Sequence, residues 1–267
     1  MKKAAPAIRV GIGGWTYEPW RGTFYPDGLK HAGELAYASQ QLTTIEINGT
    51  FYRTQSAASF AKWREETPEG FVFSVKGHRA IVNAKKLSES GEAIGWFFKS
   101  GVLELGDKLG PFLWQLAPFK KFDPDDLAGF LGLLPREAGG RPLLHAIEVR
   151  HESFLAPEAV ALLRKHNAAV VFADSDDYPA IADVTADFVY ARLQRTSEEH
   201  TTGYSPADLD RWAARAKSWA AGGEPDDLPR FGSKAAAKKK RPVFVYMISG
   251  AKVRAPAAAR ALIQRIG

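Results

Sequence analysis

Charged and amide side chains occur at or near the ends of six short hydrophobic runs in this chain. They are Glu46 in TIEIN, Lys76 in FVFSVK, Gln115 in FLWQL, Glu148 and Arg150 in HAIEVR, Asp174 in AVVFAD and Arg192 in FVYARLQ. The set contains three cations and three anions. Because burying an unpaired charge is costly, these groups must pair with one another or meet a ligand.

Side chains alternate along a strand, so each run should present its apolar and polar residues on opposite faces. Glu46 then lies opposite Ile45 and Ile47, and Arg192 shares a face with Tyr190. Asp174 joins the polar set if Phe172 points the same way.

These residue types predict particular roles. Glu46 or Glu148 would act as a general acid or base if a neighbour tuned its pKa. Lys76 would hold an oxyanion, or act as an amine nucleophile if its pKa fell. Arg150 and Arg192 would clamp a carboxylate or phosphate. The alternative is a layer of ion pairs that satisfy one another and only cap the core.

Eight predicted strands, each followed by a predicted helix, must position these residues. Strands are predicted at 8–13, 43–48, 71–76, 112–116, 144–150, 168–174, 187–193 and 243–248. Helices are predicted near 30–41, 56–66, 84–107 (broken near Gly95 or Gly101), 124–135, 157–166, 178–184 (short), 206–221 and 256–266. Eight βα units in a single domain of residues 1–267 indicate an α/β fold, a (β/α)8 TIM-type barrel of parallel strands with outer helices. The apolar face of each strand should pack on the helices, so the polar face that holds Glu46 points into the barrel, and Asp174 points inward if Phe172 does. In such barrels the site lies at the C-terminal ends of the strands.

Two predicted βα loops add candidates beside the charged set. The first is rich in aromatic residues, among them Trp15, Tyr17 and Trp20. They form either a hydrophobic lid packed on the barrel or a platform that stacks on a sugar or base. The second loop adds Asn48 and Tyr52, where Tyr52 is either a donor to substrate or a loop anchor.

The basic balance of the chain is a local feature. There are 36 basic and 30 acidic residues, and Lys234, Lys238, Lys239, Lys240 and Arg241 supply five of the basic ones. Without them 31 basic residues face 30 acidic ones. Residues 222–242 are rich in Gly, Pro and like charges, so we expect a flexible basic insertion before the last strand. Helix-to-strand loops lie opposite the expected site, so a nucleic-acid arm at Lys234 to Arg241 is the secondary interpretation.

Composition narrows the remaining classes. No cysteine is present, which excludes thiolate metal sites and Cys nucleophiles and fits a cytoplasmic protein. No apolar run is long enough to span a membrane, and the start MKKAAP indicates a short tail rather than a signal peptide. The spacing of the histidines predicts no metal site. No organic cofactor is expected. Binding of Mg or Mn by the carboxylates of Glu46, Glu148 and Asp174 is a minor alternative.

Five motifs resemble the domain-of-unknown-function 72 family over about residues 8–221. They are GIGGWTYEPWRGTFYP, TIEINGTFYR, FVFSVKGHR, LGPFLWQLAP and AIEVRHESF. The resemblance implies a barrel of uncharacterised activity. Positions that match the family motifs are Gly13, Trp15, Tyr17, Trp20, Glu46, Asn48, Phe51, Tyr52, Lys76, Gln115, Glu148, Arg150 and Arg192. The chain departs from the pattern at Asn83 and Gln194, which replace histidines, and in YMISGAKV, which replaces an Asn-rich last strand.

The residues together predict an enzyme that acts on a small anionic molecule, such as a sugar phosphate or a carboxylate. Glu46, Lys76 and Glu148 are its predicted catalytic residues. Its predicted substrate-binding residues are Trp15, Tyr17, Asn48, Tyr52, Gln115, Arg150, Asp174 and Arg192. Two other interpretations stay open: a nucleic-acid-binding or phosphodiester-cleaving barrel, and a non-catalytic ligand-binding barrel.

Overall fold

Eight parallel strands close into one barrel in a computed structural model that describes residues 7–267. Residues 1–6, where the sequence predicts a short tail, lie outside the described residues. Around the barrel the strand order is β1-β10-β9-β8-β7-β4-β3-β2. The strands are β1 (Ile8–Gly13), β2 (Thr44–Ile47), β3 (Val72–Lys76), β4 (Leu109–Gln115), β7 (His145–Glu148), β8 (Ala169–Asp174), β9 (Val189–Leu193) and β10 (Val243–Met247). The predicted TIM-type fold is confirmed.

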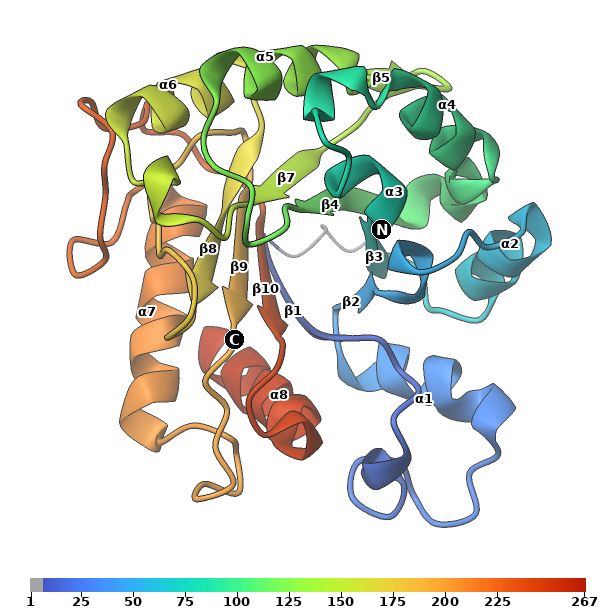
Figure 1. Ribbon diagram of the computed structural model, residues 1–267. Helices are drawn as coiled ribbons and strands as arrows, with labels where there is room; N and C mark the ends of the chain where they lie inside the picture. The colour runs from blue at the N-terminus through green and yellow to red at the C-terminus, as the bar shows by residue number, and fades with distance from the viewer. Residues whose placement is uncertain (1–6) are drawn as a thin grey trace.

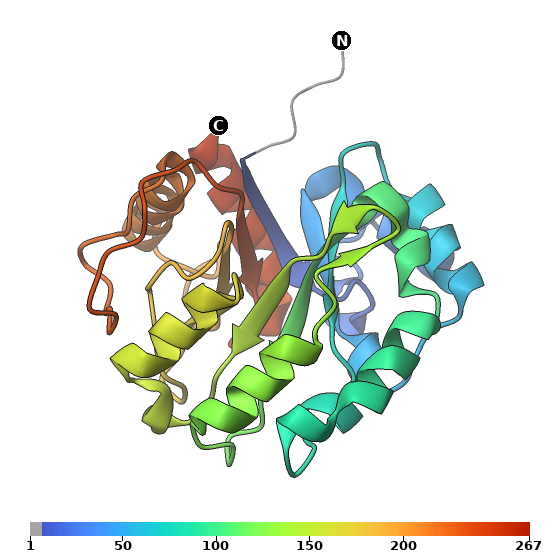
Figure 2. The same ribbon diagram turned by 90° about the horizontal axis from the view of Figure 1, so that it is seen from above.

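Helices cover the outside of the strands, as Figures 1 and 2 show. The α-helices are α1 (Glu34–Gln41), α2 (Ala57–Glu65), α3 (Arg79–Val82), α4 (Gly91–Lys99), α5 (Pro124–Leu133), α6 (Pro157–Lys165), α7 (Pro206–Ala221) and α8 (Ala255–Ile266). Short 3-10 turns are η1 (Glu18–Trp20), η2 (His31–Gly33), η3 (Gly49–Phe51), η4 (Leu87–Glu89), η5 (Val102–Lys108), η6 (Glu152–Phe154) and η7 (Lys252–Arg254). Asp123 and Ser205 cap α5 and α7 by accepting backbone N–H bonds, and a proline begins each helix.

The structure corrects three details of the predicted elements. The helix expected over 84–107 is divided into η4, α4 and η5, and its break falls at Gly101, where φ is +105°, while Gly95 stays inside α4. No helix forms at 178–184, because backbone groups there bond elsewhere: the Ala182 N–H donates to the Pro229 carbonyl at 2.8 Å. A small hairpin, β5 (Glu137–Ala138) and β6 (Arg141–Pro142), was not predicted.

Two hydrophobic layers stabilise the barrel. The larger one lies between strands and helices, and a second fills the interior with side chains such as Val171, Phe188 and Phe244. Two interior hydroxyls find partners inside the barrel, since Tyr190 bonds to Ser74 and Tyr246 to Thr44, both at 2.8 Å. Buried tyrosines of this kind need such partners, so the interior is a satisfied core and not a pore.

The basic segment 222–242 packs at the N-terminal end of the barrel, against the chain that leads into β9. The Asp183 carboxylate accepts the Phe231 and Gly232 N–H groups at 2.7 and 2.9 Å. Lys239 pairs with Asp187 at 2.6 Å. Its four lysines are exposed, whereas Arg241 is buried. Its predicted flexibility and its role toward nucleic acid stay predictions.

Within residues 7–267, helices long and apolar enough to cross a bilayer do not occur.

Candidate site at the barrel mouth

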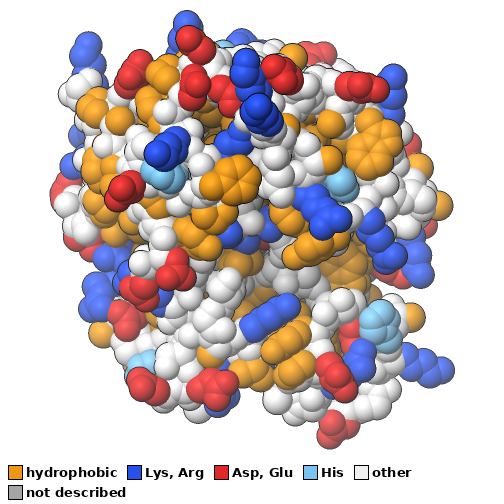
Figure 3. Space-filling model, in the orientation of Figure 1, with side chains coloured by type: hydrophobic (Ala, Val, Ile, Leu, Met, Phe, Trp, Pro, Cys, Tyr) orange, Lys and Arg blue, Asp and Glu red, His pale blue; other side chains and the backbone are white. Residues whose placement is uncertain are grey.

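The C-terminal ends of the strands face the viewer in Figures 1 and 3. Figure 3 shows that this face is hollowed near its centre, where basic side chains lie among hydrophobic ones. Six predicted site residues gather there, five from β2, β3, β4, β7 and β9 in the inward orientation that alternation predicts, and Arg150 from the segment just after β7. They are Glu46, Lys76, Gln115, Glu148, Arg150 and Arg192. We call these six residues the mouth cluster.

Arg192 joins the two carboxylates of the mouth cluster. Its Nη2 donates to Glu46 Oε1 at 3.0 Å and its Nε to Glu46 Oε2 at 3.2 Å. Its Nη1 donates to Glu148 Oε2. Arg192 is 3% exposed and both glutamates are fully buried. One guanidinium therefore pairs with two carboxylates at the floor of the mouth.

Further donors reach both carboxylates. Tyr190 donates its hydroxyl to Glu46 at 2.7 Å. Gln115 Nε2 lies 3.0 Å from both oxygens of Glu148, and Arg150 Nε donates to Glu148 at 2.9 Å. Arg150 in turn lies over the Tyr178 ring, 4.1 Å from its centroid. The carboxylates are thus held in fixed positions by several donors.

This pairing determines the charge states. Burial favours a raised pKa at Glu148, but Arg192 and Arg150 outweigh it, and the pKa of Glu148 is lowered. Burial would lower the pKa of Arg192, yet Glu148 and Glu46 raise it above its ordinary value. Glu148 and Arg192 therefore stay ionised near neutral pH, which suits Glu148 as an electrostatic group or base rather than an acid.

Lys76 differs from the other cations of the mouth cluster. It is 9% exposed, and its ammonium makes no ion pair or hydrogen bond with any side chain or backbone group of residues 7–267. Its Nζ lies over the face of the Phe51 ring, 4.3 Å from the ring centroid. Burial, assisted by Arg192, lowers the pKa of Lys76 to about 8. Its side chain is therefore available to a ligand.

Asp174 does not belong to the mouth cluster, and its predicted inward orientation is wrong. Phe172 of the same strand packs outward on Trp212 and Trp219 of α7. Asp174 is two residues further along the strand, so its side chain points to the same outer face. It lines a separate cavity of about 410 Å³ with Arg195 and Tyr204. Burial raises the pKa of Asp174, although Arg195 at 3.6 Å opposes that rise. Without Asp174 the mouth cluster holds three cations and two anions.

The aromatic residues predicted in the first two βα loops make different contacts. The Trp15 ring packs edge-on against the Trp63 ring of α2, with 5.0 Å between the ring centroids. This contact favours the interpretation of the loop as a hydrophobic lid. Tyr17 lies under the Lys252 ammonium, 4.4 Å from its ring centroid. Tyr52 is 66% exposed, and its hydroxyl makes no hydrogen bond to any group of residues 7–267.

Asn48 lines a separate cavity of about 160 Å³ at the ends of β1, β2 and β10. Its Oδ1 is buried without a partner in the described chain. An added Cβ on Gly13 would come within 2.7 Å of its amide nitrogen, so a glycine is needed there. Lys252 lines the same cavity, and nothing in the sequence pattern singled it out.

Three residues that shape the mouth cluster were not among the predicted site residues, although the sequence placed Tyr190 on the face of Arg192 and Phe51 in a family motif. Tyr190 is two residues before Arg192 on β9 and points inward as well, so the alternation of side chains could have identified it as a site residue. Phe51 and Tyr178 lie in loops where no periodic pattern operates. Of the two residues that replace family histidines, Asn83 is exposed, while Gln194 has a buried Nε2 that bonds to none of the described residues.

Carboxylates do not converge as a metal site would require. Residues 7–267 contain no group of three His, Cys, Asp or Glu side chains placed to hold an ion. Glu46 and Glu148 are bound to Arg192, and Asp174 lies outside the barrel.

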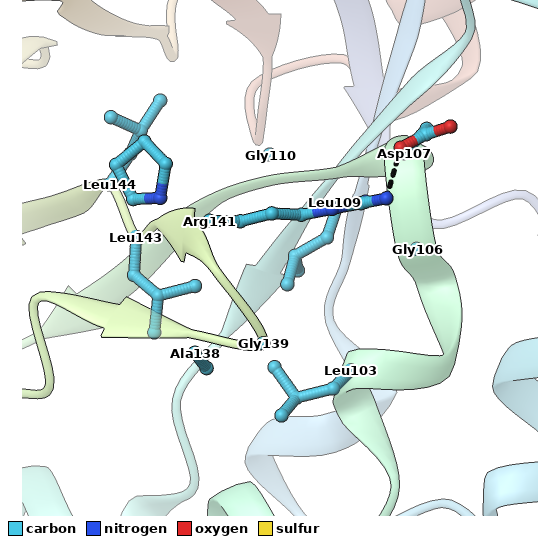
Figure 4. Close-up of a pocket in the computed structure, with 11 residues that line it drawn as sticks. Leu103, Gly106, Asp107, Leu109, Gly110, Ala138, Gly139, Arg141, Leu143 and Leu144 are labelled. Atoms are coloured by element: carbon cyan, nitrogen blue, oxygen red, sulfur yellow. Dashed lines mark ion pairs between the residues drawn. The ribbon is translucent and has the colours of Figure 1, made fainter.

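Another pocket, of about 530 Å³, lies at the N-terminal end of β4, between η5 and the β5–β6 hairpin (Figure 4). Leucine, proline, alanine and glycine residues form most of its wall. Its two charged residues, Asp107 and Arg141, pair with each other. This pocket lies at the opposite end of the barrel from the mouth cluster and offers few reactive groups.

Comparison with known proteins places this architecture in a family. A DUF72 family protein from Thermotoga maritima has a similar structure, with a TM-score of 0.71, 22% identity and 97% coverage of both chains. A DUF72 family protein from Enterococcus faecalis superposes with a TM-score of 0.68 at 16% identity, over 97% of this chain and 94% of that one.

In sequence, the chain is 26% identical over 155 residues to the UPF0759 protein YunF of Bacillus subtilis. That match covers 56% of this chain and about half of the relative, 53%. The family model described as "Protein of unknown function DUF72" matches residues 9–267. The chain belongs to the DUF72 family.

Proposed function

We propose that this chain is an enzyme that binds a small anionic molecule, a sugar phosphate or a carboxylate, at the mouth cluster. Catalysis would be electrostatic or by general acid and base, without an organic cofactor. A cytoplasmic location is part of the same proposal and rests on the absence of cysteine.

The observation that carries the proposal is the unpaired ammonium of Lys76. The three cations of the mouth cluster face two carboxylates, and both carboxylates are already bound by Arg192. A protonated Lys76 therefore leaves one positive charge in excess in a nearly buried site. Such a charge is costly unless an anion accompanies it, so an anionic ligand would complete the site.

Arg150 supports the same ligand chemistry. Its Nε binds Glu148 and its Nη1 lies 3.3 Å from the Tyr178 hydroxyl, while Nη2 makes no hydrogen bond to the described residues. The Arg150 side chain is 18% exposed. A guanidinium edge beside a free ammonium suits a phosphate or carboxylate.

A thermal-shift experiment tests the proposal. Wild-type protein is heated with inorganic phosphate, sugar phosphates, small carboxylates and short oligonucleotides. A ligand at 100 times its Kd adds about 2.7 kcal/mol, or roughly 5–11 °C in Tm for a chain of this size. Lys76→Gln should lose that shift, whereas Lys99→Gln, which removes an exposed lysine of α4, should keep it.

Two results would reject the proposal. One is that no small anion shifts the Tm of the wild type, and the other is that Lys76→Gln responds like Lys99→Gln. A response to oligonucleotides alone would favour the nucleic-acid interpretation.

A further inference from the structure

The free amine of Lys76 has the surroundings of a nucleophile rather than those of a structural lysine. Lys120, which is equally buried, donates to the Lys85 carbonyl at 2.5 Å and lies 3.9 Å from Asp126. Lys76 has no such partner in residues 7–267 and lies on the Phe51 ring beside Arg192 and Arg150. Only one of the two lysines therefore keeps its amine unoccupied.

Electrostatics at this position raise the share of the neutral amine, although the ammonium stays the major form at pH 7.5. Burial and the Arg192 guanidinium lower the pKa of Lys76 to about 8, although Glu46 and Glu148 act in the opposite direction. At pH 7.5 an amine with this pKa is unprotonated on the order of 100 times more often than an ordinary lysine. Desolvated lysines beside another cation are the ones that act as nucleophiles in proteins.

We propose that Lys76 forms an imine with an aldehyde or ketone group of a small anionic substrate. This inference rests on the proposed function and narrows its substrate class to anions that carry a carbonyl group. The Nη2 of Arg150 would hold the anionic end, since this nitrogen is free of partners among the described residues.

Imine formation needs no reactant other than the Lys76 amine and the substrate carbonyl. The Lys76 amine lone pair attacks the carbonyl carbon, a C–N bond forms, and the π electrons move to oxygen. A proton passes from nitrogen to that oxygen and gives a carbinolamine. The proton that the Lys76 ammonium released to solvent before the attack returns to this hydroxyl. Water then leaves with the electrons of the C–O bond, and the nitrogen lone pair forms the C=N bond of a protonated imine. Overall, one ammonium and one carbonyl yield one iminium and one water.

Other residues of the mouth cluster are poor candidates for a covalent step. The oxygens of Glu46 and Glu148 all accept bonds from Arg192, Arg150, Gln115 or Tyr190. The chain also contains no cysteine. Lys76 is thus the nucleophile that the mouth cluster leaves available.

Reductive trapping tests this inference. The full chain is incubated at pH 7.5 with glyoxylate, pyruvate or glyceraldehyde 3-phosphate, reduced with sodium borohydride and mapped by peptide mass spectrometry. Lys76 should carry the adduct, at roughly 100 times the level expected for a lysine of ordinary pKa. Lys76→Arg keeps a cation but should abolish the adduct, and Lys99→Arg should leave it intact. In the wild type, the rate of labelling at Lys76 should reach half its maximum near pH 8.

Labelling spread evenly over the lysines, no adduct with any of the three probes, or a half-maximum near pH 10 would overturn the inference. The wild-type pH profile keeps the test valid even if Lys76→Arg fails to fold. Phosphate and oxalate, which cannot form imines, separate the two proposals. If they stabilise the wild type while no imine forms, the inference fails and the proposed function stands.

Discussion

Replacing Arg192 by methionine should destabilise the protein strongly, because this residue joins both buried carboxylates of the mouth cluster. Glu148 would keep Arg150 and Gln115, whereas Glu46 would keep only the Tyr190 hydroxyl. Removal of one partner from a buried ion pair costs about 3–5 kcal/mol. For a domain of this size that corresponds to a fall in Tm of roughly 6–20 °C.

The assay is urea and thermal unfolding, followed by circular dichroism at pH 7 and pH 5. In Arg192→Met the loss should be smaller at pH 5, because an unpaired buried carboxylate is less costly once protonated. The double variant Arg192→Met/Glu46→Gln should recover part of the stability lost in the single variant, since it removes the charge left without a partner.

A matched control is Arg211→Met, because Arg211 is 56% exposed and pairs at the surface with Asp208. Its cost should be less than about 1 kcal/mol. A fall in Tm of less than about 2 °C in Arg192→Met would refute the reasoning. So would a double variant no more stable than Arg192→Met.

Three further changes test the packing and the pH response. Gly77→Ala should cost about 1–3 kcal/mol in urea unfolding, because its Cβ would come within 2.3 Å of the Trp114 ring. Gly95 lies on α4 with open space around it, so Gly95→Ala should raise the free energy of unfolding by about 0.5–1 kcal/mol. Equal effects of the two substitutions would contradict the packing described. Burial lowers the pKa of His145 from 6.5 to about 4, so the unfolded chain binds the extra proton between these values. The neutral His145 therefore contributes stability that is complete above pH 6.5 and is lost as the pH falls toward 4, on the order of 3 kcal/mol. An NMR titration of its ring with a midpoint near 6.5 would contradict this assignment.

The barrel and the inward orientation of most mouth residues could be predicted because the strands alternate clearly. In TIEIN, isoleucines flank Glu46 on both sides, so only one face can be apolar. In AVVFAD the alternation is absent, because a strand buried on both faces is apolar on both. Parity therefore carried no information about Asp174, and its predicted orientation was wrong.

The side-chain contacts between strands could not be predicted from the sequence. Alternation places Arg192, Glu46 and Glu148 inside the barrel, but it does not determine which cation pairs with which carboxylate. The free ammonium of Lys76 follows from that pairing, so it became visible only in three dimensions. Phe51 and Tyr178 lie in loops, where packing against distant residues determines side-chain positions.

The bonds of Arg192 also bear on the order in which the barrel assembles. They link β9 to β2 and to β7, neither of which is its neighbour in the sheet, and they span 146 and 44 residues of sequence. Such contacts form only after long segments have been brought together, at an entropic cost that precedes any gain. Interactions completed late in folding mainly affect the rate of unfolding. The charged floor of the mouth thus slows the opening of the closed barrel more than it speeds its formation.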